Sequence, residues 1–317
     1  MSSSRVLEVT DLAVDYRVGR RTVRAVSDVA LTIDHGKTLG LVGESGSGKT
    51  TIGRAILGLA PTAAGRIVFN GQDLAGASPR QRHRTAGRIR AVFQDPYSSL
   101  NPALPIAASL LEALPDQRRL PRADARQHLD GLLEKVGLDP AIAARYPGRL
   151  SGGQRQRVAI ARALISSPEL IICDEAVSAL DVSIQAQILN LLRDVQRDTG
   201  VSYLFIGHDL DVIRYMSDHV AVLYRGQLLE TGPVDVVTRR PRHPYTQTLV
   251  AATPTLHPET IATQRVGTTD AQQTGGEGCS YAAQCPLAID TCHTQHPTPQ
   301  QAADGGHVAC HRYPDAA

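Results

Sequence analysis

The chain has 317 residues, enough for one large domain or two domains of ordinary size. Hydrophobic residues make up 42% of the sequence and charged residues 20%, which is the balance of a globular protein with a core. The formal net charge of +2 gives no basic field of the kind that a nucleic-acid binder carries, so we expect no nucleic-acid partner.

No stretch of the sequence approaches the ~20 uninterrupted apolar residues that a membrane-spanning helix requires. The N-terminus, Met1–Arg5, runs directly into a strand-like segment and lacks the apolar core of a signal peptide. We therefore expect a protein that stays in the cytoplasm. If it acts at a membrane, it must dock on the helices of another protein.

The N-terminal part of the chain combines strand signals with one helix. Residues 7–33 alternate apolar and polar side chains, which predicts short antiparallel strands. Residues 38–42 are typical of a buried strand that ends in a glycine-rich loop. A helix is expected over about 50–59, stopped by Pro61, and residues 66–69 predict a strand that enters a tight turn.

Further along, strands and helices alternate. Residues 89–93 predict a strand, and from about 101 to 164 the pattern is helical, with Ala, Leu and Arg dominating. Strand signals return at 170–173 and 201–206, separated by an amphipathic stretch from about 184 to 197. This pattern predicts an α/β domain with a parallel sheet that a helical insertion interrupts.

After Gly232 the periodicity weakens, and residues 253–278 are polar and typical of a linker. Four of the five cysteines follow in the last segment. These four are Cys279, Cys285, Cys292 and Cys310. In a reducing cytoplasm such a cluster indicates a metal site before a disulfide framework.

The glycine-rich sequence at 43–50 fits the P-loop pattern, with a strand before it and a helix after it. Backbone N–H groups would close around the phosphates, and the helix N-terminus adds a favourable dipole. We expect Lys49 to bridge the β- and γ-phosphates and the Thr50 hydroxyl to bind Mg²⁺. The alternative is a flexible glycine loop. The residues predicted to bind ATP here are Gly43, Glu44, Ser45, Gly46, Ser47, Gly48, Lys49, Thr50 and Thr51.

An apolar run at 170–173 leads into two carboxylates, Asp174 and Glu175. In P-loop enzymes an Asp at such a strand end holds Mg²⁺. A second carboxylate directly after it can polarise the attacking water, so Glu175 is the predicted catalytic base. An acidic turn after a core strand is the alternative, and the P-loop makes the functional interpretation the stronger one.

The sequence Ser151-Gly152-Gly153-Gln154 precedes a helical stretch. Ser-Gly-Gly at a helix start forms an anion nest of exposed N–H groups, the dipole and a hydroxyl. Because this chain already has one phosphate loop, a second nest makes sense if it completes the site of a neighbouring molecule. Without the other motifs, an N-cap followed by a loose loop would be the preferred interpretation.

These motifs together resemble the ABC ATPase family over about residues 5–250. The resemblance implies an α/β fold: a P-loop NTPase (RecA-like) core with an antiparallel β-subdomain and a helical insertion subdomain. A small cysteine-containing C-terminal extension completes it. The resemblance also implies ATP and Mg²⁺ as ligands. Two such ATPases would sandwich two ATP molecules, each site combining one chain's P-loop with the other chain's Ser151 motif.

Further site residues follow from the resemblance alone. Gln94 resembles the loop glutamine that senses Mg²⁺ and faces the transmembrane partner, and Asp181 lies in the loop that links the two sites of the dimer. His208 resembles the switch histidine that contacts the γ-phosphate, and Tyr16 is placed like the aromatic that stacks on adenine. Ordinary polar strand ends, and for Tyr16 a core aromatic, are the alternatives. Ala176 departs from the family, which usually has proline there, and we expect function to survive.

Three segments, at 93–102, 181–187 and 242–246, resemble the peptide/nickel branch of ABC importers. That branch implies a second, homologous ATPase subunit in a heterodimer, two transmembrane permease subunits and, indirectly, an extracytoplasmic solute-binding protein. The chain would then lie on the cytoplasmic face of the membrane. A soluble ABC mechanoenzyme acting on DNA or ribosomes is the rival, but the long coiled-coil insertion or tandem cassettes typical of one are not present.

The resemblance and the pattern together predict three regions. Residues 5–250 form the nucleotide-binding domain, with the helical insertion at about 95–165. Residues 251–278 form a linker, and 279–317 form the C-terminal extension. The cysteine spacing there does not match a zinc ribbon. Four thiolates are a common shell for an iron–sulfur cluster, so one [4Fe–4S] cluster is favoured, with a zinc site or no metal as alternatives.

Overall fold

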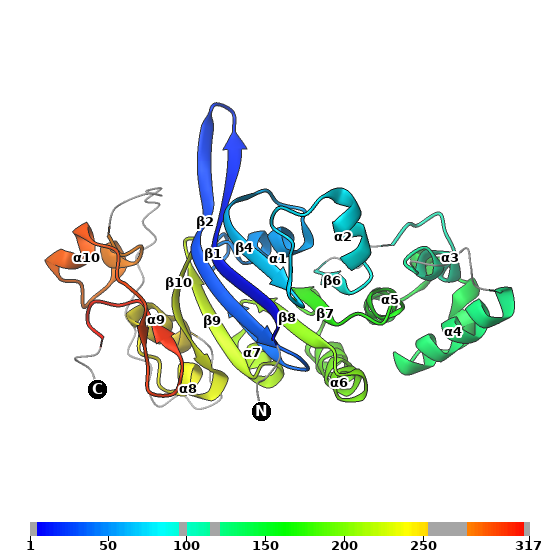
Figure 1. Cartoon of the computed structure of the whole chain (residues 1–317). Helices are drawn as coiled ribbons and strands as arrows, with labels where there is room; N and C mark the ends of the chain where they lie inside the picture. Colours follow the sequence, from blue (N-terminus) through cyan, green and yellow to red (C-terminus); the bar gives the residue numbers. More distant parts are fainter. Residues whose placement is uncertain (1–4, 95–99, 115–120, 253–277, 314–317) are drawn as a thin grey trace. The chain divides into compact units, whose positions relative to one another are not determined.

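The computed structural model describes residues 5–94, 100–114, 121–252 and 278–313, which Figure 1 draws in colour. The described chain divides into two compact units. The first unit is formed mainly by Ile33–Thr38 and Phe69–Ile206. The second unit is formed by Glu8–Thr32, Leu39–Val68 and the described residues from Gly207 onward.

The second unit begins with two long strands, β1 (Arg5–Val18) and β2 (Arg21–Asp34), joined by a two-residue loop (Figure 1). Each strand has 14 residues, so this hairpin is longer than the short strands predicted from the alternation. The strand β4 (Thr62–Phe69) lies on the other side of β1. Side chains such as Leu12 and Ile67 are fully buried, and they anchor this sheet to the core.

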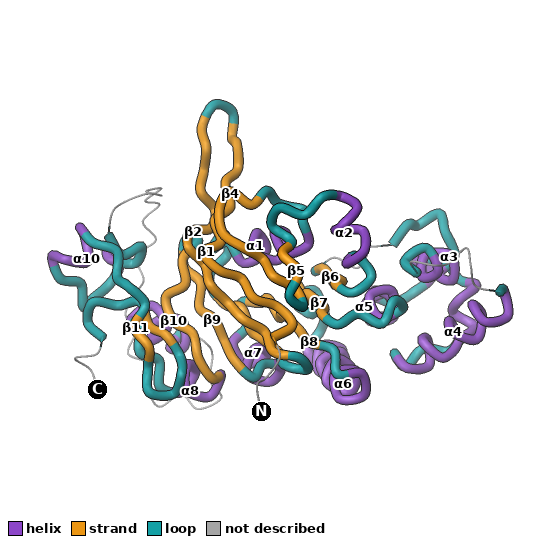
Figure 2. The backbone as a smooth tube through the Cα atoms, in the orientation of Figure 1, coloured by secondary structure: helices purple, strands orange, loops and turns teal. Residues whose placement is uncertain are grey.

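A second sheet of this unit carries the strand that leads into the glycine-rich loop (Figure 2). Its strands are β3 (Thr38–Val42), β9 (His219–Tyr224), β10 (Gln227–Pro233), β12 (His307–Val308) and β11 (Gln300–Gln301). β9 runs parallel to β3 and antiparallel to β10, and β12 pairs antiparallel with β10 and with β11. The C-terminal extension thus adds two short strands to the sheet that holds β3.

The helices of the second unit are α1 (Lys49–Leu57), α7 (Leu210–Met216), α8 (Val234–Arg239), α9 (Pro244–Ala251) and α10 (Asp290–Thr294), with the 3₁₀ turn η4 (Ala282–Gln284). The helix α1 ends at Gly58, which adopts a left-handed conformation with φ 75° and donates its N–H to Ala55 and Arg54. The sequence prediction that Pro61 stops this helix was therefore wrong. A glycine just past the last turn ends the helix first.

The first unit contains three parallel strands, β6 (Ile89–Phe93), β7 (Leu170–Asp174) and β8 (Ser202–Gly207), with β7 between the other two. All three are close to their predicted bounds. Their side chains are mostly buried, as expected for parallel strands that helices cover.

Helices make up most of the rest of the first unit. They are α2 (Pro79–Thr85), α3 (Ile106–Leu111), α4 (Arg122–Lys135), α5 (Gly152–Leu164) and α6 (Val182–Thr199), with the 3₁₀ turns η2 (Pro140–Ala144) and η3 (Pro147–Arg149) and the short strand β5 (Gln72–Asp73). Within the described parts of residues 100–164 the chain is helical, as the composition indicates. The predicted α/β class, with its antiparallel part, helical insertion and small C-terminal extension, is confirmed.

The linker predicted at 251–278 falls almost wholly outside the described residues. Across the parts of the chain that the structure describes, no helix combines the length and the apolar character needed to cross a bilayer.

Candidate functional site

The glycine-rich loop joins β3 to α1 within the second unit and encloses an ammonium group. Lys49 Nζ donates to the carbonyl oxygens of Gly43 and Glu44, at 2.7 and 2.8 Å, and to Ser47 Oγ at 3.3 Å. The Lys49 side chain is buried, so its charge is concentrated inside the loop. The N-cap of α1 is Gly48, so the first turn of the helix presents its N–H groups and the positive end of its dipole to the loop.

Two glycines of this loop are required by close backbone approach. Gly43 has φ 153°, and a Cβ there would lie 2.0 Å from the carbonyl oxygen of Leu223. Gly48 has φ 103°, and a Cβ there would lie 2.8 Å from the carbonyl oxygen of Ala25. The loop therefore packs closely against the backbone at Leu223 and Ala25, and only glycine fits at these two positions. Glycine-rich loops of this kind, with successive backbone N–H groups exposed, bind phosphate groups. The glycine cradle, the enclosed ammonium and the hydroxyl of Thr50 fit a nucleoside triphosphate with Mg²⁺.

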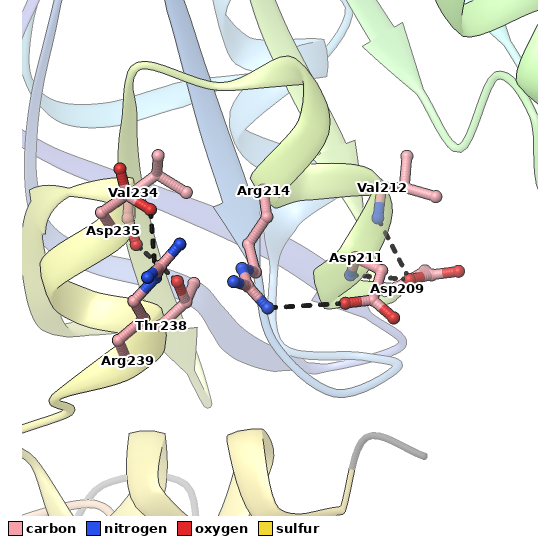
Figure 3. A network of polar contacts seen from close by, with 8 residues as sticks. All are labelled: Asp209, Asp211, Val212, Arg214, Val234, Asp235, Thr238 and Arg239. Atoms are coloured by element: carbon pink, nitrogen blue, oxygen red, sulfur yellow. Dashed lines mark hydrogen bonds and ion pairs between the residues drawn. The ribbon is translucent and has the colours of Figure 1, made fainter. Parts of the chain in front are cut away.

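Two other predicted nucleotide contacts belong to the same unit. Tyr16 lies on β1 and is half-buried, so it is not part of the fully buried core. His208 is exposed and follows β8 directly. The next residue, Asp209, is the N-cap of α7, and its Oδ1 accepts from the backbone N–H groups of Asp211 and Val212 at 2.9 and 3.2 Å (Figure 3). This capping fixes the chain on the helical side of His208.

An acidic edge forms in the first unit where the parallel strands end. In the parallel pair of β6 and β7, Phe93 lies opposite Asp174. Gln94 and Glu175 are the next residues after the two strands, so both follow at the carboxyl ends of neighbouring strands. Glu175 follows Asp174, and its backbone N–H donates to the carbonyl oxygen of Ile206 at 3.0 Å. The fold thus brings Gln94, Asp174 and Glu175 to one edge. The carboxyl ends of parallel strands are where α/β proteins place their ligands.

The turn after this edge is held from two sides. Glu175 has φ 50°, a left-handed conformation that is unusual for a residue with a side chain. Ser178 Oγ donates to the Glu175 carbonyl oxygen at 3.0 Å, and Gln156 Nε2, from α5, donates to the Ala176 carbonyl oxygen at 2.6 Å. Strained backbone of this kind concentrates at functional sites and needs such support.

The Ser-Gly-Gly-Gln motif begins α5 as a capping box. Ser151 Oγ accepts from the Gln154 backbone N–H at 3.3 Å, and Gln154 Oε1 accepts from the Ser151 backbone N–H at 3.1 Å. Arg155 is buried and donates to the carbonyl oxygens of Pro147 and Leu150 at 2.9 and 2.7 Å, which fixes the preceding chain. The N-cap predicted as the alternative is therefore present. These bonds join residues of this chain alone, so a contact with a second molecule stays a prediction.

Asp181 is also a helix cap, since its Oδ1 accepts from the Ile184 backbone N–H at 3.0 Å at the start of α6. Its predicted role in linking two sites is untested by this contact. The predicted site residues thus fall into two groups, each within one unit. Tyr16, residues 43–51 and His208 belong to the second unit, and Gln94, residues 151–154, Asp174, Glu175 and Asp181 belong to the first.

The four cysteines of the extension do not form the predicted ligand set. Within the described residues, which include all four, no group of three or more His, Cys, Asp or Glu side chains is arranged to hold a metal ion. Burial raises the pKa of the Cys279, Cys285 and Cys310 thiols, and the neighbouring cysteines of the extension add to this shift. The predicted iron–sulfur cluster is therefore not supported by the described residues.

Sequence reasoning missed two polar side chains that contact the site. Gln156 supports the turn after Glu175, and Tyr245 Oη accepts a hydrogen bond from the Glu44 backbone N–H in the glycine-rich loop at 3.1 Å. Tyr245 lies in the segment that indicated the peptide/nickel branch, so its position was marked. Its contact with the loop was not, because it joins residues 201 positions apart.

Two family models match this chain. One, described as "ABC transporter", matches residues 26–178. The other, described as "Oligopeptide/dipeptide transporter, C-terminal region", matches residues 229–292, which include the Tyr245 segment and three of the four extension cysteines.

Curated relatives are similar over nearly the whole chain. The "Probable peptide ABC transporter ATP-binding protein y4tS" of Sinorhizobium fredii is 45% identical over 305 residues, covering 95% of this chain and 86% of that protein. A Brucella abortus protein named for peptide import and ATP binding is 43% identical over 320 residues, covering 97% and 94%. Among solved structures, a dimeric ATP-binding cassette, MJ0796, described in a post-hydrolysis state with ADP and Pi, matches with TM-score 0.65. That match is at 27% identity and covers 72% of this chain and 98% of the other.

Proposed function

Because the chain belongs to the ABC transporter ATPases and is the ATP-hydrolysing subunit of a peptide importer, we propose that the site residues of each unit serve ATP binding or hydrolysis. The observation that carries this proposal is the glycine cradle with the Lys49 ammonium inside it. Lys49 would exchange its bonds to the loop carbonyls for the β- and γ-phosphates, and the backbone N–H groups of 43–51 would surround them. Tyr16 would stack on the adenine.

The acidic edge of the first unit carries the residues that we propose for Mg²⁺ binding and hydrolysis. Asp174, Gln94 and the Thr50 hydroxyl are the residues that would hold Mg²⁺, whose charge offsets that of the phosphates when it is bound. Glu175 would accept the proton of the attacking water, and His208 would contact the γ-phosphate. The left-handed backbone at Glu175 supports this role, since the turn is held in a strained conformation by Ser178 and Gln156.

The start of α5 would act on another molecule. Ser151, Gly152, Gly153 and Gln154 would complete the nucleotide site of a second, homologous ATPase subunit, with Asp181 linking the two sites. An ATP-binding subunit of a peptide importer works with membrane permeases. We propose two permease subunits, contacted through Gln94 and the helical insertion, and a position on the cytoplasmic face of the membrane.

The cargo would be a dipeptide, an oligopeptide or a nickel chelate, delivered by an extracytoplasmic solute-binding protein. The C-terminal region supports this range, since its family model is described by oligopeptide and dipeptide transport. Binding measurements on the associated solute-binding protein, with dipeptides, longer peptides and nickel chelates as probes, would assign the cargo.

The site assignment is tested by Glu175→Gln, which keeps the size of the side chain and removes the base. Loss of a general base costs about 10²–10⁴-fold in rate, so ATP turnover should fall by this factor. ATP binding should persist, and the dimer should accumulate in its closed form. The measurements are steady-state phosphate release, equilibrium ATP binding and sedimentation. Near-normal hydrolysis by this variant would remove Glu175 from the mechanism.

A further inference from the structure

Tyr245 connects the C-terminal region to the phosphate loop. It is 1% exposed, and its Oη accepts from the Glu44 backbone N–H at 3.1 Å. The same residue of the loop is held at its other end, because Lys49 Nζ donates to the Glu44 carbonyl oxygen at 2.8 Å. Tyr245 and Lys49 therefore fix Glu44 from both of its backbone polar groups.

Three tyrosine rings define where the Tyr245 hydroxyl lies. The Tyr245 ring centroid is 4.6 Å from that of Tyr224, the last residue of β9, and 5.3 Å from that of Tyr281. Tyr224 and Tyr281 contact each other edge to face, with centroids 5.4 Å apart. We call Tyr224, Tyr245 and Tyr281 the tyrosine cluster. Tyr281 belongs to the C-terminal extension, so the extension packs directly on the residue that holds the phosphate loop.

The N-terminus of α9 is fixed independently of the rings. His243 is its N-cap, and Nδ1 accepts from the Tyr245 backbone N–H at 3.0 Å. Burial lowers the pKa of His243 to about 4, so its imidazole is neutral and available as an acceptor at neutral pH. The backbone N–H groups of Arg242 and His243 donate to the two carboxylate oxygens of Glu230, both at 3.0 Å.

The extension reaches the same point by a second route. Arg242 forms a two-pronged ion pair with Asp304, at 2.7 and 3.1 Å, and each side chain is less than a quarter exposed. Glu230, on β10, lies opposite Val308 of β12 in the sheet. Contacts from two parts of the extension, one at Tyr281 and one at 304–308, therefore hold the start of α9 on the core.

We propose that Tyr245 is a positioning residue for ATP binding, and that the C-terminal extension, through the tyrosine cluster, sets the geometry of the phosphate loop. The proposal rests on the role of Lys49 and its loop in binding the phosphates. Without the Tyr245 hydroxyl, the peptide group between Gly43 and Glu44 loses the bond at its N–H, and the Gly43 carbonyl oxygen on the same peptide group, which accepts from Lys49, is held less firmly. The nucleotide must then order the loop when it binds, and the free-energy cost of this ordering weakens ATP binding. Once ATP is bound the loop is ordered, so the rate of hydrolysis changes less.

The test compares two variants of the full-length chain that each remove one hydroxyl from the same cluster. Tyr245→Phe keeps the ring and loses the bond to Glu44. Tyr224→Phe is the matched control, because the Tyr224 hydroxyl donates to Gln284 Oε1 at 3.2 Å and not to the loop. Loss of one buried hydrogen bond predicts a Kd for ATP with Mg²⁺ that is roughly 5- to 30-fold higher for Tyr245→Phe. The Kd of Tyr224→Phe should stay within about twofold of wild type, and kcat at saturating ATP should change little in both.

A third variant separates this inference from the assignment of the phosphate loop. Lys49→Ala should abolish ATP binding if the loop binds the phosphates. If Lys49→Ala binds ATP as wild type does, the loop assignment itself fails. If Lys49→Ala fails to bind while Tyr245→Phe binds normally, only the proposal for Tyr245 is overturned. Equal weakening by Tyr245→Phe and Tyr224→Phe would also overturn it, since a general loosening of the cluster would then explain both.

Hydrogen exchange of the wild-type chain gives a readout that needs no variant. The Glu44 amide should exchange slowly, because its N–H is bonded to a buried hydroxyl. Exchange of that amide at the rate of an exposed loop would overturn the proposal even if Tyr245→Phe did not fold.

Discussion

Replacing Gly152 by aspartate separates what the start of α5 does within this chain from what it does for a second chain. Gly152 is the first residue of α5, and a Cβ there would meet no atom within 4 Å. A carboxylate at the first position of a helix interacts favourably with its dipole, by about 0.3–1 kcal/mol. The isolated chain should therefore be as stable as wild type or slightly more so, with an increase of a few degrees at most in melting temperature.

In a dimer the same carboxylate should be harmful. If the N-terminus of α5 faces the triphosphate bound by another chain, a new negative charge lies beside several existing ones. Two like charges 4 Å apart repel by about 4 kcal/mol at the effective dielectric of a protein surface. That energy corresponds to roughly a 10³-fold loss, so ATP hydrolysis and dimer closure should fail while the isolated chain still binds ATP.

The assay measures phosphate release by the assembled transporter and ATP binding by the isolated chain. Gly152→Ala is the control, because it adds the Cβ without the charge. Gly153 is a poorer position for this test, since a Cβ there would lie 2.8 Å from Ile184 Cγ2 on α6. Relieving that contact would cost about 1–3 kcal/mol in this chain alone. Hydrolysis by Gly152→Asp at the rate of Gly152→Ala, or loss of ATP binding by its isolated chain, would refute the role on a second molecule.

Two further predictions concern buried polar side chains. Gln156→Met removes the donor to the Ala176 carbonyl oxygen and also removes Oε1, a buried atom for which the described residues provide no hydrogen-bond partner. The melting temperature of this variant should thus change by only a few degrees. Its ATP turnover should fall by up to about 100-fold, because the turn after Glu175 loosens. Unchanged turnover would contradict the supporting role of Gln156. Acidification from pH 6.5 to about 4 should destabilise the wild type, because the unfolded chain binds a proton at His243 that the folded chain, with a pKa of about 4, does not. Burial raises the pKa of Glu230, and this group opposes the effect of His243. The measurement is therefore the difference in unfolding free energy between wild type and His243→Asn, which should shrink by up to about 3 kcal/mol from pH 6.5 to about 4. A difference that stays constant over that range would contradict the argument.

Short strands rich in apolar residues were predictable because their signal is local. The bounds of β3 and β6 match the prediction, since each is a short, largely apolar run that a polar or glycine residue ends. The strand β9 carries a similar apolar run, at 219–224, and was missed although the signal was present. By contrast, α9 has eight residues and begins with Pro244, and its position depends on the tyrosine cluster and on Glu230. A helix that tertiary contacts stabilise gives little periodic signal.

The site residues, too, were predictable only where their signal is local. Glycines of the phosphate loop and the two carboxylates were predictable because the chemistry is carried by consecutive residues whose backbone forms the site. The contact between Tyr245 and Glu44 was not, because no local pattern indicates which buried hydroxyl reaches which amide. For the cysteines, their clustering in the last segment indicated a metal site, whereas the arrangement that decides ligation depends on the folded extension.

The turn that carries Glu175 shows why the missing proline at Ala176 need not impair this chain. A left-handed residue with a side chain costs about 1–3 kcal/mol, so the conformation of Glu175 persists only if its surroundings hold it. Two hydrogen bonds to other elements and one within the turn do so. Glu175 N–H donates to Ile206 on β8, Ser178 Oγ donates to the Glu175 carbonyl, and Gln156 on α5 donates to the Ala176 carbonyl. Proline would restrict one backbone dihedral, whereas these bonds fix the turn against the sheet and against the helix of the Ser-Gly-Gly-Gln motif. The turn that carries Glu175 therefore depends on α5, the helix that we propose to contact the ATP bound by a second subunit. Gln156 thus connects the catalytic base of this chain to the motif that would act on the other ATP.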